Sequence, residues 1–205
     1  MKVLKVTLAV AFALALIITC ASALMSAKTI EENILRFHIR ANGNSEEEQA
    51  VKIAVRDCVL QGSAELFENS ADTEESIRIA TENLDYIRGI VDEKLEELGV
   101  QYRSTIKVSD EFFPTKYYGD MALPAGIYTA LVIELGSGKG ENWWCMLYPS
   151  LCPYGESVCQ DERTKEELKA LIGSENYKMI TSSRPTVKFK IAELWGRMLS
   201  LVNTK

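Results

Sequence analysis

The chain of 205 residues is 47% hydrophobic and 25% charged, a composition typical of a folded protein with one sizeable core. Its 12 glycines and 5 prolines leave no room for a long disordered linker. A formal charge of −6 repels phosphate backbones, so we expect no nucleic-acid partner.

The first 23 residues have the features of an export signal. Lys2 and Lys5 make the start positive, residues 6–18 form an uncharged run, and Ala21-Ser22-Ala23 is a small-x-small cleavage sequence. We therefore expect residues 1–23 to be a signal peptide.

Cleavage before Leu24 would leave residues 24–205 as a single extracytoplasmic domain. Loss of the two signal lysines leaves 21 of the 23 basic groups against 29 acidic groups, a formal charge of −8. An uncleaved anchor is the alternative, because weakly polar residues continue to Met25 and a tilted helix of that length can reach across a bilayer. In both cases the lysines on the cytoplasmic side place the rest of the chain outside the membrane.

Residues 34–41 alternate between apolar and polar side chains, which predicts a half-buried strand. Its apolar face carries Leu35, Phe37, Ile39 and Ala41. Its polar face carries Arg36, His38, Arg40 and Asn42. This polar face allows two interpretations: a solvated strand face, or a basic patch on an acidic protein that suits an acidic partner or lipid headgroups.

Two helices are predicted next. The first, over residues 45–60, begins at Ser45 with a glutamate three residues later, which is a capping box. The second, over residues 72–98, begins at Asp72 with the same spacing, and its apolar positions recur every three or four residues until Gly99. A coiled coil is conceivable for the second helix, but a helix laid across a sheet is expected.

Three later segments predict strands: residues 102–108, 127–135 and 142–148. Residues 112–118 are rich in aromatic side chains and contain Pro114, which predicts an edge strand or a bend. The glycine-rich residues 136–140 lack the spacing and the following helix of a phosphate loop, so we expect a hairpin loop there. Two more helices are expected over residues 161–172 and 185–202. The apolar side of the last helix is formed by Val187, Ile191, Leu194, Trp195, Met198 and Leu201.

These elements together predict an α+β fold, in which an antiparallel or mixed β-sheet packs against several amphipathic helices after the signal segment. Trp143 and Trp144 must lie on opposite faces of their strand, because side chains alternate. Either one tryptophan is in the core and the other exposed, or both are buried in a two-sided core.

The cysteines are informative once the signal segment is removed. Cys58, Cys145, Cys152 and Cys159 remain, an even number in a compartment that permits oxidation. The last three are spaced at seven residues without a C-x-x-C pair, so we expect no metal site. A disulfide between Cys145 and Cys152 is the favoured pairing. Cys58 lies on the apolar face of a helical pattern, where a buried free thiol is expected.

Catalytic chemistry finds little support in the sequence. His38 is the single histidine, and the two neighbouring arginines should hold it neutral rather than make it a strong base. A cysteine nucleophile would need Cys145 or Cys152 beside His38, and nothing in the sequence places them together. No G-x-S-x-G, H-E-x-x-H or repeated acidic metal motif occurs. We therefore expect a protein that is not an enzyme, with no catalytic residues, cofactor or metal.

Two blocks of the chain resemble the stage II sporulation protein R family. The first block is Arg36-Phe37-His38-Ile39-Arg40-Ala41-Asn42 with Ser45, Gln49, Lys52 and Val55-Arg56-Asp57. The second block comprises residues 123–131, Asn142-Trp143-Trp144-Cys145, and Tyr148-Pro149 to Leu151-Cys152. Val187-Lys188-Phe189-Lys190 also fits, so the resemblance spans residues 30–200. Gly43-Asn44 and Glu48 depart from the usual family residues, both in the first turn.

The resemblance implies a signalling role in endospore formation. Such a protein is made in the forespore, secreted into the intermembrane space, and triggers a membrane-embedded aspartic protease that matures a pro-sigma factor. Membrane contact is expected only through the signal segment or at the surface. Partner-binding candidates are Arg36, His38, Arg40, Asn42, Trp143 and Trp144.

Two other classes of function stay open. A structural or adhesion module of the cell envelope would bind wall or membrane without any proteolytic consequence. A cysteine hydrolase would carry a reactive thiol.

Overall fold

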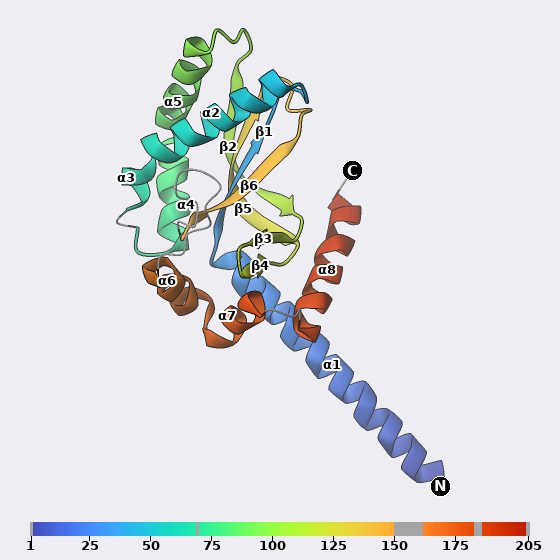
Figure 1. Cartoon of the computed structure of the whole chain (residues 1–205). Coiled ribbons are helices and arrows are strands. Elements are labelled where there is room, and N and C mark those ends of the chain that lie inside the picture. Colours follow the sequence, from blue (N-terminus) through green and yellow to red (C-terminus); the bar gives the residue numbers. More distant parts are fainter. Residues whose placement is uncertain (1, 69, 150–161, 183–185, 204–205) are drawn as a thin grey trace. The chain divides into compact units, whose positions relative to one another are not determined.

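The computed structural model describes residues 2–68, 70–149, 162–182 and 186–203 (Figure 1). The chain forms two compact units, which we name by their content. The sheet unit consists of Glu32–Glu111 and Tyr128–Leu171. The terminal unit, which contains both chain ends, consists of Met1–Glu31, Phe112–Ile127 and Ile172–Lys205.

The main sheet has four strands in the order β2-β5-β1-β6. Their bounds are β1 Leu35–Arg40, β2 Ser104–Phe113, β5 Gly126–Leu135 and β6 Asn142–Tyr148. Strand β1 is parallel to β5 and antiparallel to β6, so the sheet is mixed. The predicted α+β class, with a mixed sheet and several helices, is confirmed.

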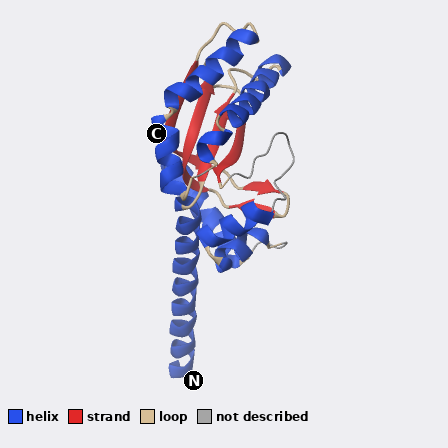
Figure 2. Cartoon of the chain, turned by 90° about the vertical axis from the view of Figure 1, so that its left-hand side faces the viewer, coloured by secondary structure: helices blue, strands red, loops and turns tan. Residues whose placement is uncertain are grey.

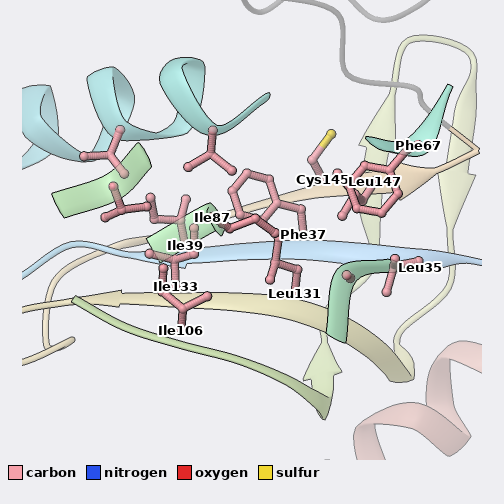
Figure 3. Close-up of a cluster of buried hydrophobic side chains, with 14 of the residues drawn as sticks. Leu35, Phe37, Ile39, Phe67, Ile87, Ile106, Leu131, Ile133, Cys145 and Leu147 are labelled. Carbon is pink, nitrogen blue, oxygen red and sulfur yellow. The ribbon is translucent and has the colours of Figure 1, made fainter. Parts of the chain in front are cut away.

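Helices cover one face of this sheet and form the main core with it (Figures 1 and 3). The helices after β1 are α2 (Glu46–Gly62), α3 (Ala64–Phe67), α4 (Thr73–Glu82) and α5 (Leu84–Glu97), and α6 (Glu162–Ile172) follows later in the chain. Figure 3 shows Phe37, Leu131 and Ile87 pointing into the same cluster, one residue each from β1, β5 and α5. The apolar side of β1 therefore faces the helices, as its alternation predicts.

Local signals placed the helix starts correctly. The Ser45 side chain accepts a hydrogen bond from the Glu48 amide, and the Asp72 side chain accepts one from the Glu75 amide. The predicted continuous helix over residues 72–98 is wrong, because it breaks at Asn83 into α4 and α5. The Asn83 side chain donates to the Ile79 carbonyl at 2.8 Å, which competes with a regular helical path.

Strand β1 is not half-buried. It lies between β5 and β6, and its second face is covered as fully as its first: Arg36 is 0% and His38 3% exposed. Aromatic side chains of the neighbouring strands help to cover this face. Tyr128 of β5 lies under the Arg36 guanidinium, and Trp144 of β6 stacks on His38.

The glycine-rich residues 136–140 do not form a hairpin loop. Strands β5 and β6 are not neighbours, since β1 lies between them, so this loop carries the chain across the end of β1. The Gly140 amide donates to the Ala41 carbonyl at 2.8 Å. A Cβ at Gly140 would collide with the backbone oxygens of Gly43 and Ala41, so the close crossing requires glycine.

The terminal unit contains the long helix α1 (Lys2–Glu32), strands β3 (Lys116–Tyr118) and β4 (Met121–Leu123), and helices α7 (Ser174–Thr181) and α8 (Val187–Asn203). Strands β3 and β4 pair antiparallel. Pro114 lies between β2 and β3, which agrees with the edge strand or bend expected for residues 112–118. Helix α7 was not predicted. Helix α1 is one long continuous helix in both views, and its residues 2–18 are exposed (Figures 1 and 2).

Helix α8 packs in the terminal unit through its narrow side. Phe189 and Ala192 are buried, and a Cβ at Gly196 would collide with the Ala125 carbonyl, so the two backbones touch there. The broad apolar side predicted from the sequence is turned outward. Leu194 is 62% and Met198 52% exposed.

Candidate interaction site at the end of strand β1

The structure brings the two sequence blocks of the candidate site side by side. Strand β6 runs antiparallel to β1, with Trp144 opposite His38 and Asn142 opposite Arg40. Because paired residues share a face, the polar residues of β1 form one row with Trp144 and Asn142. Four of the six partner-binding candidates thus share this face of the sheet: Arg36, His38, Arg40 and Trp144.

Arg36 is at the buried end of this row. Its Nε donates to the Cys145 carbonyl at 2.8 Å, and its guanidinium carbon is 5.0 Å from the centre of the Tyr128 ring. A fully buried cation makes no contact with a partner protein. Its removal leaves polar atoms of the sheet unsatisfied, so Arg36 is a structural residue.

His38 occupies the middle of the row. Its Nε2 is 2.9 Å from Asn142 Oδ1, and its ring stacks on Trp144 with centroids 5.5 Å apart and planes at 21°. Burial lowers the pKa of His38 below its usual value, and Arg40 lowers it further, while Asn142 and two glutamates oppose the shift. The neutral imidazole expected from the sequence therefore agrees with the structure, although burial rather than the arginines is its main cause.

Arg40 is at the open end of the row, where its charge is neutralised. It donates to Glu134 and to Glu111, each at 2.8 Å, and Lys107 lies 3.3 Å from Glu111. Two cations and two anions thus form a cluster without net charge. The interpretation of this strand face as an exposed basic patch is wrong, because Arg36 and His38 are buried and Arg40 is paired.

Asn42 connects the glycine-rich loop to the start of α2 through hydrogen bonds. Its Oδ1 accepts from the Ser137 amide at 2.9 Å, and its carbonyl accepts from the Ser137 hydroxyl at 2.8 Å. Its Nδ2 donates to Glu48 at 2.9 Å. On the far side of the loop, the Glu141 amide donates to Asn44 Oδ1 at 2.8 Å. The end of β1 is therefore a rigid junction built by two segments that are far apart in the sequence.

Trp143 and Trp144 lie on opposite faces of β6, and both are partly buried rather than one buried and one exposed. Trp143 meets Phe37 edge-on with ring centres 5.8 Å apart, and the Arg56 guanidinium lies 4.9 Å from its centroid. Trp144 stacks on His38. Both tryptophans therefore stabilise the sheet while keeping an accessible edge.

Several residues of this site were not predicted from the sequence. Glu134 and Glu111 neutralise Arg40, Asn142 holds His38, and Arg56 covers Trp143. One signal was available: Glu134 is a lone charge in the otherwise uncharged segment 127–135, and a buried carboxylate there needs a cation.

Cys145 is disulfide-bonded, and Cys58 and Cys20 are free. Cys152 lies outside the described residues, so its pairing with Cys145 stays a prediction. Cys58 is partly rather than fully buried. Cys145 belongs to the helix-covered core with Phe37, whereas His38 is on the opposite face of the sheet. A Cys145–His38 catalytic pair is therefore not formed.

Among the described residues, no group of three or more His, Cys, Asp or Glu side chains is placed to hold a metal ion. The residues of the row are hydrogen-bonded within the chain, the charges at its open end are balanced by Glu111 and Glu134, and burial lowers the pKa of its histidine.

Comparison with known proteins points to one family. The sequence model described as stage II sporulation protein R (spore_II_R) matches residues 31–158. Stage II sporulation protein R of Bacillus subtilis (strain 168) is 36% identical over 137 residues, which cover 65% of this chain and 61% of that protein. The match thus spans less than two thirds of the relative's own length. No solved structure is significantly similar.

Proposed function

This chain belongs to the stage II sporulation protein R family and so serves in sporulation; on that basis we propose that it is a secreted activator of a membrane-embedded aspartic protease. The protease in turn processes a pro-sigma factor. The activator is made in the forespore and acts from the intermembrane space. The family match over residues 31–158 carries the proposal, because it includes the junction at the end of β1.

Export is supported by α1. Within the described residues, it is the one helix long and apolar enough to cross a membrane, a property that signal sequences share. Lys2 and Lys5 stand at its start, which favours a cytoplasmic N-terminus. Everything after the apolar segment would then be delivered outside the cytoplasm.

The site supports activation of the protease by binding, without a reaction catalysed by this chain. His38 is buried and stacked, and Cys145 is in a disulfide, so neither offers a ready nucleophile or base. An activator needs only to bind the active state of the protease more tightly than the inactive state. A shift from mostly inactive to mostly active takes about 5 kcal/mol of differential binding.

The contact surface we propose is the open end of β1. Asn142 and Glu141 are exposed there, and Arg40, Asn42 and Trp144 are partly accessible. This assigns the protease contact to the junction and not to the buried Arg36 and His38. Because the junction is held by several hydrogen bonds, little conformational entropy is lost when a partner binds.

Reconstitution in a bacterium that does not sporulate tests the proposal directly. The protease, its pro-sigma substrate and this chain are expressed together, and cleavage of the substrate is followed by immunoblot. We expect cleavage only when the chain is present and exported. A form that lacks residues 2–23 should accumulate in the cytoplasm and fail to activate. Equal cleavage without the chain would overturn the proposal.

The contact surface is tested in the same system. Glu141→Lys reverses a charge at the junction, and Glu96→Lys makes the same change on an exposed position of α5. We expect reduced substrate cleavage for Glu141→Lys at unchanged secretion, and normal cleavage for Glu96→Lys. Equal activity of both variants would remove the junction as the contact surface but leave the activator role standing.

An envelope structural module is the alternative that the same family membership permits. It predicts altered wall or membrane association in a deletion strain, with normal maturation of the sigma factor. Deletion of the gene in its sporulating host separates the two functions, because only the activator predicts accumulation of the uncleaved precursor.

A further inference from the structure

Helix α8 presents an apolar stripe that no other described part of the chain covers. Its members are exposed by 43% to 81% of their surface: Val187, Leu194, Trp195, Met198 and Leu201. At 100° per residue they fall within about 120° of the helix circumference, so they form one face of the helix. An uncovered apolar face of this length on an exported protein marks an interaction surface.

Positive charges border the stripe on both sides. At 100° per residue, Lys188 lies next to Trp195 on one side of the stripe. Lys190 and Arg197 lie on the other side of the stripe, the side of Leu194. The one acidic residue in the sequence of α8, Glu193, has only 9% of its side chain exposed. It accepts from Lys190 and from Arg197, each at 2.8 Å, and so lies away from the stripe.

The helix therefore carries two more basic than acidic residues on a chain whose formal charge is −6. A helix with apolar residues and tryptophan on one side, and Lys and Arg along its borders, has the pattern of helices that lie flat in the interface of an anionic bilayer. The apolar side chains enter the acyl region, and the cations reach the lipid phosphates.

A second copy of the chain fits this stripe less well. Two such helices face to face would bring their bordering cations together, and like charges at short distance repel. The terminal unit also contains the segment of the described chain best suited to a bilayer. Helix α1, the candidate membrane-crossing helix, belongs to the same compact unit as α8.

We propose that the exposed stripe of α8 lies on the surface of an anionic membrane. The proposal is independent of protease activation, because it concerns the lipid contact alone. In the function proposed above, this contact would keep the chain at the membrane after the signal segment is cleaved.

The test uses the full chain reconstituted in vesicles of phosphatidylcholine, with and without phosphatidylglycerol. Because α1 anchors every sample alike, the readout is the fluorescence of Trp195 and its quenching by lipids with brominated acyl chains. A Trp195→Phe variant supplies the signal of Trp143 and Trp144 for subtraction. We expect Trp195 to be quenched in the anionic vesicles, less in phosphatidylcholine alone, and less again at high salt.

Matched variants test whether quenching of Trp195 depends on the stripe itself or on any exposed apolar side chain. Leu194→Gln with Met198→Gln removes two members of the stripe, and the quenched fraction of Trp195 should fall about tenfold. Leu98→Gln changes a side chain exposed to the same 43% as Trp195 but on the loop after α5, and quenching should persist.

Two results would overturn the proposal. Trp195 emission that is identical in brominated and plain anionic lipids would show that the stripe does not enter the bilayer. Unquenched but blue-shifted emission together with intermolecular cross-links through α8 would assign the stripe to a second copy. Circular dichroism of each variant establishes that loss of quenching is not loss of fold.

Discussion

At the residue scale, charged groups inside this protein are held by partners that are distant in the sequence. Arg40 reaches Glu111 and Glu134 on two other strands, and Arg36 reaches the backbone of β6. The contacts with Glu134 of β5 and with β6 tie β1 to its two neighbours at a defined register, and the contact with Glu111 reaches past β5 to β2. We infer that these groups specify how the strands align, since a shift by one residue would turn every charge to the opposite face.

The Arg40 cluster gives a first prediction. Arg40→Gln leaves two carboxylates, 17% and 27% exposed, with less positive charge to balance them, and should lower the free energy of unfolding by about 1–3 kcal/mol. Arg78→Gln is the matched control, because Arg78 also pairs with two glutamates but is 57% exposed. Chemical denaturation should show a lower midpoint for Arg40→Gln and an unchanged one for Arg78→Gln. Equal midpoints would mean that the cluster contributes nothing to stability.

His38 gives a prediction about pH. Its pKa is lowered below 6.5 in the folded chain, so below that pH the unfolded state binds more protons than the folded state. The stability contributed by His38 is complete above pH 6.5 and decreases as the pH falls through that value. His38→Gln should remove this dependence. The test is the difference in denaturation midpoint between about pH 7.5 and about pH 5.5, which should be larger in the natural chain than in the variant. The same difference in both chains would contradict it.

At the element scale, the loop over residues 136–141 and the start of α2 close over the end of β1 from two sides. Backbone and side-chain hydrogen bonds connect them through Asn42, Asn44 and Gly140. The loop is thereby held in one position although it carries several glycines. A rigid loop at the exposed end of a central strand is a suitable element for partner recognition.

Helix α8 gives a prediction at the same scale. Gly196→Ala places a methyl group against the Ala125 carbonyl and should destabilise the packing of α8 by about 1–3 kcal/mol. Gly89→Ala in α5 is the control, since a Cβ there meets nothing within 4 Å and should stabilise the helix by up to about 1 kcal/mol. Hydrogen exchange of the α8 amides should be faster in Gly196→Ala alone. Unchanged exchange would show that α8 can shift without cost.

At the scale of the whole molecule, the predicted cleavage site falls inside a structural element. Helix α1 is continuous from Lys2 to Glu32, and Ala23, Ala27 and Ile30 on it are buried. Removal of residues 1–23 would therefore discard the exposed part of the helix and keep the segment with two of these buried residues. The exported domain and the apolar segment are separable in this way.

The corresponding prediction is that the mature chain begins at Leu24. Ala23→Leu should block cleavage, because signal peptidases require a small residue at that position. Met25→Leu leaves the small-x-small sequence intact and should be processed normally. N-terminal sequencing of the exported protein decides the outcome, and a natural chain that retains Met1 would show an anchored form instead.

The sequence alone determined those features that depend only on residues close together in the chain. The apolar run of α1, the caps at Ser45 and Asp72, and the alternation of β1 are each contained in one short segment. The two family blocks likewise identified the residues that meet across β1 and β6. Such signals act over a few residues, so they can be read without knowing the fold.

The tertiary structure alone decided what covers each face. Alternation along β1 shows that its faces differ, but not that the polar face is buried beneath Tyr128 and Trp144. The strand order is non-local too: Arg40 meets its two glutamates 71 and 94 residues later in the chain. The helical periodicity of α8 likewise identifies an apolar stripe without saying whether core or solvent meets it. Burial depends on which elements pack together, and that is a property of the whole chain.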